Sequence, residues 1–158
     1  MAVSADDFRS ALSRFPSGVN VVTTKDADGR PHGITVSAFC SVSLSPPLVL
    51  ICIEKTTASH DAFSASKVFV VNMLRKSQQH LSEQFAAPAV DKFEDVDFRT
   101  GIDGVPVLKQ ALASIECRLR NAFDGGDHTI YVGEVETISV DNGEPLVYHQ
   151  GDYRKLEN

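Results

Sequence analysis

Residues 19–39 read VNVVTTKDADGRPHGITVSAF, and this stretch decides the fold class. Its two ends, Val19–Thr24 and His32–Phe39, are rich in β-branched residues, which predicts two strands. Between them lies Asp26-Ala27-Asp28-Gly29, whose glycine supplies the positive φ that a tight turn requires. The stretch therefore predicts a β-hairpin, which is an antiparallel pair.

The rest of the chain repeats this pattern of short strands with few helices between them. The expected strands are Leu48–Ile53, Val68–Leu74, Ser114–Ala122, Thr129–Val140 and Pro145–Tyr148, and the expected helices are Asp6–Phe15, Thr57–Ser66 and Ser77–Ala87. Asp141-Asn142-Gly143 predicts a second hairpin turn. A doubly wound nucleotide-binding sheet needs a glycine fingerprint between a strand and a helix, and the sequence has none. We therefore expect a mainly β protein, a β-barrel with short helices, in a single domain over residues 1–158.

Composition excludes several classes of function. With 42% hydrophobic and 23% charged residues and a net charge of −6, the chain has no clustered basic surface for nucleic acid or an anionic membrane. The longest apolar runs, Leu48–Ile53 and Val68–Val71, are far shorter than the ~20 residues of a membrane-spanning helix. The first residues lack a secretory signal, so a cytoplasmic protein is expected. Cys40, Cys52 and Cys117 have no metal-ligand spacing, and we expect reduced core thiols and no bound metal.

Two polar segments are candidates for binding a cofactor. In Gly33–Ser43, strand alternation is expected to place Thr35, Ser37, Ser41 and Ser43 on one face, where neutral hydroxyls suit a flavin ring or its ribityl chain. The alternative is a half-exposed strand whose hydroxyls face water. In Cys52–His60, the residues Glu54, Lys55, Thr56 and Ser59 lie where a strand ends and a helix begins, a place that suits a phosphate. An ordinary helix cap without a ligand is the alternative.

Two aromatic side chains complete the candidates. Gly126-Asp127-His128 precedes a strand, and His128 can orient a nicotinamide amide or supply a proton. The alternative is a turn histidine bonded to the backbone, and these three residues taken alone favour it. Phe85 can contact a cofactor or belong to the core.

Taken together, the chain resembles the flavin reductase-like proteins with an FMN-binding split barrel, the reductase components of two-component flavin monooxygenases. The resemblance runs from Phe8 to Tyr153 and rests on the order and spacing of Phe15-Pro16-Ser17-Gly18-Val19, Gly33–Ser43, Pro46-Pro47-Leu48-Val49, Asn72-Met73-Leu74, Phe85-Ala86, Asp91-Lys92-Phe93, Gly126-Asp127-His128, Gly133-Glu134-Val135 and Gly151-Asp152-Tyr153. Ser45 departs from the family pattern, which often has an acid before the Pro-Pro pair. The resemblance implies an antiparallel, Greek-key split β-barrel that forms a homodimer with the flavin near the subunit interface.

The resemblance also implies roles for individual residues. Thr35, Val36, Ser37 and Ser41 would line the flavin ring and ribityl chain, Glu54, Lys55, Thr56 and Ser59 would take its pyrimidine edge and phosphate, and Phe85 is a further cofactor contact. His128 would position the nicotinamide, and Tyr153 and Arg154 would help to close its pocket.

The function that the resemblance implies is an NAD(P)H:flavin oxidoreductase. It would reduce FMN or FAD by hydride transfer and supply the reduced flavin to a partner monooxygenase. Two alternatives remain open: a flavin- or haem-binding split-barrel module without nicotinamide turnover, and a purely structural or interaction domain. NADH is favoured over NADPH because no arginine cluster for a 2′-phosphate is evident. The sequence does not decide between FMN and FAD.

Overall fold

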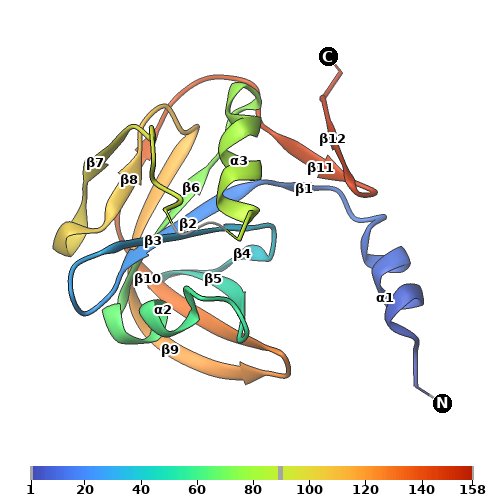
Figure 1. The fold of residues 1–158 in the computed structure, drawn as a ribbon, viewed down its shortest axis with the longest axis horizontal. Helices are drawn as coiled ribbons and strands as arrows, with labels where there is room; N and C mark the ends of the chain where they lie inside the picture. The colour runs from blue at the N-terminus through green and yellow to red at the C-terminus, as the bar shows by residue number, and fades with distance from the viewer. Residues whose placement is uncertain (1, 89–90, 158) are drawn as a thin grey trace.

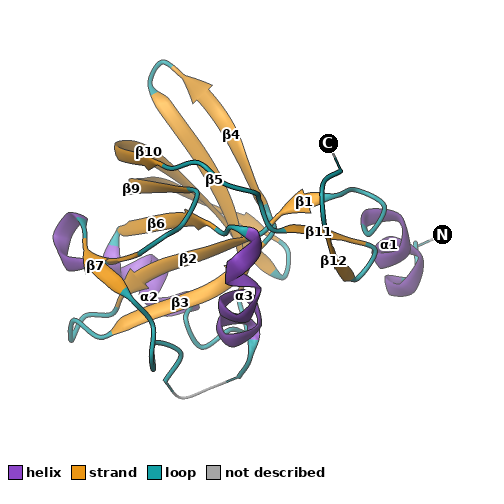
Figure 2. Ribbon diagram, turned by 90° about the horizontal axis from the view of Figure 1, so that it is seen from above, coloured by secondary structure: helices purple, strands orange, loops and turns teal. Residues whose placement is uncertain are grey.

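The computed structural model describes residues 2–88 and 91–157, and its main element is a curved sheet of seven strands (Figures 1 and 2). The strand order is β3-β2-β6-β9-β10-β5-β4, and every neighbouring pair is antiparallel. The strands are β2 (Asn20–Lys25), β3 (Pro31–Val36), β4 (Phe39–Leu44), β5 (Pro47–Glu54), β6 (Val68–Met73), β9 (Ala113–Gly125) and β10 (His128–Val140). The expected mainly β, antiparallel architecture is therefore confirmed.

Two small sheets and short helices flank the main sheet. One small sheet joins β1 (Ser17–Gly18), β11 (Val147–His149) and β12 (Asp152–Arg154), and the other joins β7 (Phe98–Thr100) and β8 (Pro106–Leu108). The α-helices are α1 (Ala5–Leu12), α2 (His60–Ser66) and α3 (Gln79–Ala86), and the 3-10 helices are η1 (Lys76–Gln78) and η2 (Ile102–Gly104). The predicted helices Asp6–Phe15, Thr57–Ser66 and Ser77–Ala87 thus exist, but each is shorter than expected.

The hairpin predicted from residues 19–39 is present. Thr23 of β2 lies opposite Gly33 of β3, and Gly29 has a φ of +79° in the turn. The Asp26 carboxylate accepts hydrogen bonds from the backbone N–H groups of Asp28 and Arg30, both at 2.9 Å. The expected strand His32–Phe39, however, ends at Val36, and the chain turns at residues 37–38 before β4 begins.

The second predicted hairpin, at Asp141-Asn142-Gly143, is wrong. β10 ends at Val140, and the chain crosses to β11 in the small sheet instead of pairing back on β10. The Asp141 N–H donates to the Leu112 carbonyl at 2.7 Å, and its carboxylate accepts from Arg75 at 2.7 Å. These long-range bonds hold the segment against the start of β9, so local turn propensity does not decide its path.

The core consists of two main clusters on opposite faces of the sheet's β2–β6 part. One lies inside the curved sheet and includes Val22, Ile51, Phe63, Phe69 and Tyr131. The other lies beneath α3 and includes Val21, Leu74, Leu81, Phe85 and Leu146. Of the cysteines, Cys117 is buried and Cys52 is half-buried, but Cys40 is exposed. The expectation of three core thiols is wrong for Cys40 because β4 is an edge strand.

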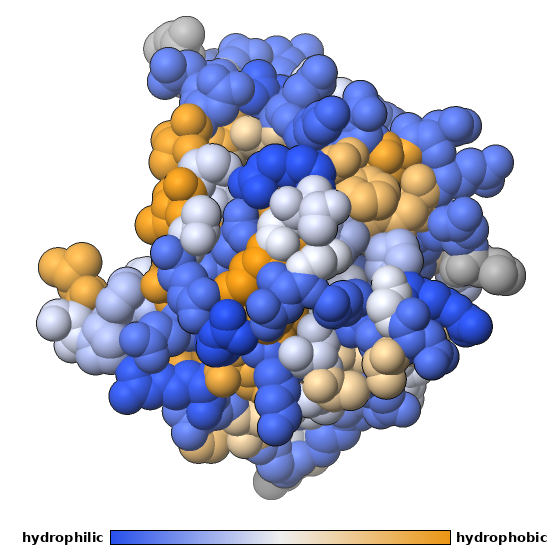
Figure 3. Space-filling model, turned by 90° about the vertical axis from the view of Figure 1, so that its left-hand side faces the viewer, coloured by the Kyte–Doolittle hydropathy of each residue, from blue (hydrophilic) through white to orange (hydrophobic). Residues whose placement is uncertain are grey.

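The surface is uneven in character. The face that carries the β2–β3 turn and β7 is mostly hydrophilic, with small apolar spots (Figure 3). In contrast, α1 stands away from the sheet and buries none of its residues (Figure 1), and Phe8, Leu12 and the following Phe15 are all exposed. No helix in the described part of the chain combines the length and apolar character needed to cross a membrane.

Candidate functional site

The ends of β3 and β5 and the start of β10 enclose a small cavity of about 180 Å³, which we call the strand-end cavity. Its lining residues come from three segments that are far apart in sequence: Ile34, Thr35, Val36, Ser37, Ala38, Cys52, Ile53, Glu54, Thr57 and His128. The antiparallel register brings them together, because His128 lies directly opposite Glu54. Thr35, Val36, Ser37, Glu54 and His128, all predicted from the sequence, therefore share one cavity.

His128 is held in place by its neighbour in the turn. Its Nδ1 lies 2.7 Å from Oδ1 of Asp127, and the imidazole is 40% exposed. The hydrogen bond from His128 lowers the pKa of Asp127 below its ordinary value. Because an ionised carboxylate only accepts hydrogen bonds, Nδ1 carries the proton. In a neutral ring, Nε2 is then left as an acceptor at the cavity.

The expected row of hydroxyls on one face of a strand is not formed. β3 ends at Val36, so Thr35 and Ser41 belong to different strands. The Thr35 hydroxyl donates to the Ser82 carbonyl at 2.6 Å, which ties β3 to α3. Ser41 is exposed on β4 and does not line the strand-end cavity. Strand alternation fails here because the turn at residues 37–38 interrupts it.

The polar groups of Lys55 and Thr56 bond to neighbouring protein residues. The Lys55 ammonium forms an ion pair with Asp124, and its backbone N–H donates to the Asp127 carbonyl at 2.9 Å. The ion pair lowers the pKa of Asp124. The Thr56 hydroxyl donates to the Glu54 carboxylate at 3.1 Å. Lys55 therefore fastens the β9–β10 turn, which carries His128, to the end of β5.

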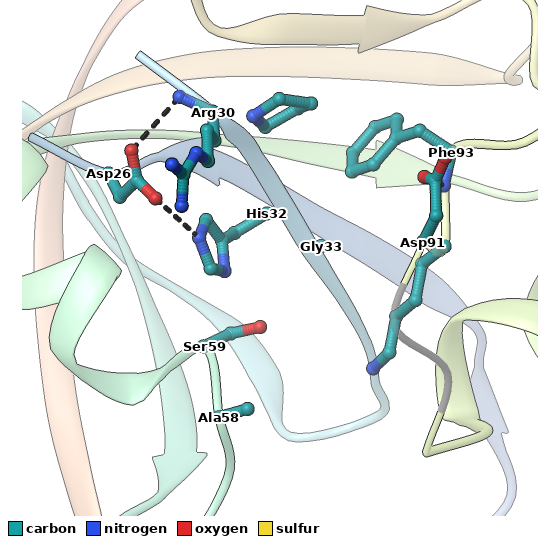
Figure 4. Close-up of a pocket in the computed structure, with 10 residues that line it drawn as sticks. Asp26, Arg30, His32, Gly33, Ala58, Ser59, Asp91 and Phe93 are labelled. Atoms are coloured by element: carbon teal, nitrogen blue, oxygen red, sulfur yellow. Dashed lines mark hydrogen bonds and ion pairs between the residues drawn. The ribbon is translucent and has the colours of Figure 1, made fainter. Parts of the chain in front are cut away.

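Ser59 immediately precedes α2, whose first residue, His60, lies three residues beyond the predicted helix start at Thr57. Two successive turns occupy the intervening residues, with the Thr57 N–H donating to Glu54 and the His60 N–H donating to Thr57. Ser59 is only 6% exposed, and its hydroxyl makes no capping bond. Nor does this hydroxyl bond to any other described side chain. It faces a second, larger cavity (Figure 4).

This second cavity, which we call the hairpin cavity, has a volume of about 540 Å³. It is lined by residues of the β2–β3 hairpin, the start of α2 and the segment after α3: Asp26, Arg30, Pro31, His32, Gly33, Ala58, Ser59, Asp91, Lys92 and Phe93. Nε2 of His32 lies 3.1 Å from the Asp26 carboxylate (Figure 4). Sequence reasoning missed this site, although Asp91-Lys92-Phe93 is part of the family pattern.

A third cavity, the apolar cavity, has a volume of about 410 Å³ and is lined mainly by apolar side chains, among them Phe15, Val19, Phe39, Leu74 and Leu146. Ser37 lines both the apolar cavity and the strand-end cavity. Consecutive residues line the hairpin cavity and the strand-end cavity at two places, since Ile34 follows Gly33 and Ala58 follows Thr57. The hairpin, strand-end and apolar cavities are thus lined in turn by successive residues of β3 and of residues 37–39.

Besides Ser41, Lys55 and Thr56, three further predicted site residues lie outside the strand-end and hairpin cavities. Phe85 is completely buried in the core beneath α3. Tyr153 is half-buried, and its hydroxyl lies 2.7 Å from the Ser82 hydroxyl, so it reaches Thr35 only through Ser82. Arg154 is exposed on β12. Across residues 2–88 and 91–157, no cluster of three or more His, Cys, Asp or Glu side chains is placed to hold a metal ion.

Comparison with known proteins places these features in a family context. The model of the "Flavin reductase like domain" matches residues 12–157. The chain is 45% identical to "Flavin reductase (NADH)" from Kitasatospora aureofaciens, covering 97% of the chain and 82% of that protein. It is 38% identical to "Flavin-dependent monooxygenase, reductase subunit HsaB" from Rhodococcus jostii, covering 99% and 80%. Two other relatives are longer, and the chain spans 47% and 63% of their lengths.

Among solved structures, the chain is similar to "Streptomyces globisporus C-1027 NADH:FAD oxidoreductase SgcE6 in complex with NAD and FAD fragments". The TM-score is 0.91 at 37% sequence identity, over 99% of this chain and 97% of the other. This likeness confirms the fold class expected from the sequence.

Proposed function

The chain belongs to the flavin reductase-like family, and we propose that it is an NAD(P)H-dependent flavin reductase. In this proposal it reduces FMN or FAD by hydride transfer, as one flavin reductase-like domain. One observation carries the proposal most directly. The strand-end cavity unites the two segments assigned to the flavin with His128, the residue assigned to the nicotinamide.

The residues present fit a flavin. Its ring has a polar edge and an apolar edge, which correspond to the strand-end cavity and the apolar cavity on either side of Ser37. Its phosphate could bond to Ser59, a residue that is 6% exposed and whose hydroxyl makes no capping bond at the start of α2. Among the described residues, no buried side-chain nitrogen or oxygen lacks a hydrogen-bond partner. The Ser59 hydroxyl is therefore accessible at the hairpin cavity, where a polar ligand could bond to it.

The residues of this chain would position the flavin and the nicotinamide and exclude water from the cavity. When bound, the flavin supplies the acceptor for a hydride from NADH or NADPH, a reaction that depends on proximity and orientation. Ile34, Val36 and Ile53 form an apolar wall of the strand-end cavity, which excludes water from one side of the ring. His128 keeps Nε2 available to accept a hydrogen bond from the nicotinamide amide, because Asp127 fixes Nδ1–H.

Most of the other residues assigned to the flavin or the nicotinamide would act by holding neighbouring residues in place. Lys55 holds the turn that carries His128, and Thr56 orients the Glu54 carboxylate. Tyr153 supports Thr35 through Ser82, and Phe85 supports β3 from below. Ser41 and Arg154 are exposed and would contact ligand only with a further chain or a closed segment.

We also propose a homodimer. Large apolar side chains are exposed on α1, β4 and the end of β10: Phe8, Leu12, Phe15, Val42, Leu44, Ile138 and Val140. Large exposed apolar side chains that gather on one surface mark protein interfaces, and these residues are candidates for such a surface. β4 pairs with β5 beside the strand-end cavity, so a second copy on β4 would bring the interface close to the flavin. Light scattering that finds a monomer at micromolar concentration would contradict this assignment.

The partner proposed for the reduced flavin is a monooxygenase, since HsaB is named as the reductase subunit of such an enzyme. Three free cysteines are consistent with a reducing compartment such as the cytoplasm.

The proposed activity is tested by NADH oxidation at 340 nm with FMN, FAD and riboflavin in turn, followed by the same assay with NADPH. We expect NADH consumption that requires added or bound flavin. Flavin binding without NADH consumption would contradict the reductase assignment and leave a flavin-binding module.

A further inference from the structure

Four polar side chains outside the three cavities join α2 to β10, and we call them the α2–β10 network. His60 is the first residue of α2, and its Nε2 lies 2.8 Å from the Thr129 hydroxyl and 3.3 Å from the Tyr131 hydroxyl. One turn further along α2, the Ser64 hydroxyl lies 2.6 Å from the same Tyr131 hydroxyl. Because residues four apart lie on the same face of a helix, two successive turns of α2 are bonded to β10. None of the four residues lines the hairpin, strand-end or apolar cavity.

The α2–β10 network is largely shielded from water. Tyr131 is 1% exposed, and its ring centroid is 6.3 Å from that of Phe63 in the core. The His60 side chain is 18% exposed, and its ring centroid is 6.1 Å from that of Tyr131. Hydrogen bonds in such surroundings are costly to break, since the groups released find little water to bond to. These bonds therefore fix the position of His60 relative to β10.

The bond between His60 and Thr129 connects the two parts of the proposed site. His60 directly follows Ser59, which lines the hairpin cavity, and Thr129 directly follows His128, which lines the strand-end cavity. Since neighbouring residues of a strand point to opposite faces, Thr129 can bond to α2 while His128 faces the strand-end cavity. The bond thus links the end of the flavin segment, Glu54–Ser59, to the residue assigned to the nicotinamide.

A second bond holds His128 from its other side. The Lys55 N–H donates to the Asp127 carbonyl at 2.9 Å. Residues 127 and 129, which flank His128, are therefore both bonded to residues 55–60. Hydride transfer requires the reacting atoms to lie about 3–3.5 Å apart, and a misplacement of about 1 Å can cost about 100-fold in rate. A small movement of His128 relative to the flavin segment would therefore slow the reaction.

We propose that His60 is a positioning residue, which fixes His128 relative to the flavin segment through Thr129 and contacts neither the flavin nor the nicotinamide. This inference rests on the proposed function, because it requires that NADH is oxidised beside His128. Loss of the bond changes the distance over which the hydride moves, and so lowers kcat, while the residues that bind the flavin stay in place.

Steady-state NADH oxidation and flavin titration of the same full-length variants test the proposal. We expect His60→Ala to lower kcat for NADH about tenfold, less than a misplacement of 1 Å costs, with the flavin Kd within about twofold of the wild type. Glutamine carries its Nε2 the same number of bonds from Cα as histidine, so His60→Gln should restore kcat to within about threefold of the wild type. His80→Ala, which removes an exposed histidine of α3 outside the three cavities, is the matched control and should change neither quantity.

A double-mutant cycle ties the effect to the bond itself. Thr129→Val keeps the shape of the side chain but removes the hydroxyl, and it should lower kcat about as much as His60→Ala. In the double variant the second change should lower kcat by less than about twofold further, because the bond is already lost. Melting temperatures verify folding, and if His60→Ala does not fold, Thr129→Val decides by its kcat and its flavin affinity.

Four results would overturn the proposal. An unchanged kcat in His60→Ala, or no recovery in His60→Gln, would show that the bond does not position His128. Losses of kcat that multiply in the double variant would show that His60 and Thr129 act separately. A loss of flavin affinity equal to the loss of kcat would assign His60 to the flavin segment alone. Failure of the proposed function is distinguishable, because then no flavin would support NADH oxidation in the wild-type chain.

Discussion

Gly33 provides the sharpest test of how the site is built, because β3 and α3 approach each other there. A Cβ atom at residue 33 would lie 2.6 Å from Cε1 and 2.8 Å from Cδ1 of Phe85, and 3.3 Å from Cζ of Phe93. Carbon atoms pack at about 3.5–4.0 Å, so Gly33→Ala requires a displacement of about 1 Å. Phe85 cannot supply it easily, since the ring is fully buried and packed against Phe93.

The expected loss of stability follows from these contacts. Overpacking of a core costs about 1–3 kcal/mol, and replacing glycine by alanine offsets about 0.4–1 kcal/mol through the unfolded chain. We therefore expect Gly33→Ala to lower the free energy of unfolding by about 1–2 kcal/mol. For a chain of 158 residues, this corresponds to a fall in Tm of about 2–8 °C, measurable by calorimetry or thermal denaturation.

Two further variants isolate the cause. Gly18→Ala is the matched control, because an added Cβ there meets nothing within 4 Å, and its Tm should not fall. Phe85→Leu combined with Gly33→Ala should be more stable than the sum of the two single changes predicts, with a coupling of about 0.5–3 kcal/mol. Equal melting temperatures for Gly33→Ala and Gly18→Ala, or strict additivity in the double variant, would refute this packing argument.

Two other predictions concern titratable groups. The Lys55 ion pair lowers the pKa of Asp124 below its ordinary value of 3.8, so its stabilisation is present above pH 3.8 and is lost as the pH falls through the lower folded value. The Tm deficit of Asp124→Asn should therefore shrink on acidification from pH 6 to pH 3, and a constant deficit would show that the ion pair is not its cause. Burial raises the pKa of Cys117 to about 12, so this thiol should resist Ellman's reagent at pH 8 until the chain unfolds. Cys117→Ser should leave the number of thiols that react in the native state unchanged.

The sequence predicted those parts of the fold that depend on local chemistry. The β2–β3 hairpin was predictable because Gly29 and the two β-branched runs all favour it. The hairpin predicted at Asp141-Asn142-Gly143 was wrong because Arg75 and Leu112, which are distant in sequence, bond to this segment and determine its path. The strand boundaries at residues 36–39 were also not predictable, since Val36-Ser37-Ala38-Phe39 contains no glycine or proline to mark the break between β3 and β4.

The candidate site, too, could be predicted only in part from the sequence. Strand order alone could not place His128 beside Glu54, but the family pattern put both in one site, and the register in the structure brings them together. The residue type of Phe85 did not show whether its ring lies in the core or in the site, because the buried position of the ring depends on the absence of a side chain at Gly33. The hairpin cavity was missed because Arg30, Ser59 and Lys92 come from three separate segments without a shared motif.

The central claim is that His128 positions the nicotinamide beside a flavin in the strand-end cavity. Steady-state NADH oxidation by His128→Ala, combined with flavin titration of the same variant, tests it most directly. The account predicts about a tenfold loss in kcat/KM for NADH, equivalent to ~1.4 kcal/mol, with flavin affinity within twofold of the wild type. An unchanged KM and turnover for NADH, or an equal loss of flavin binding, would contradict it.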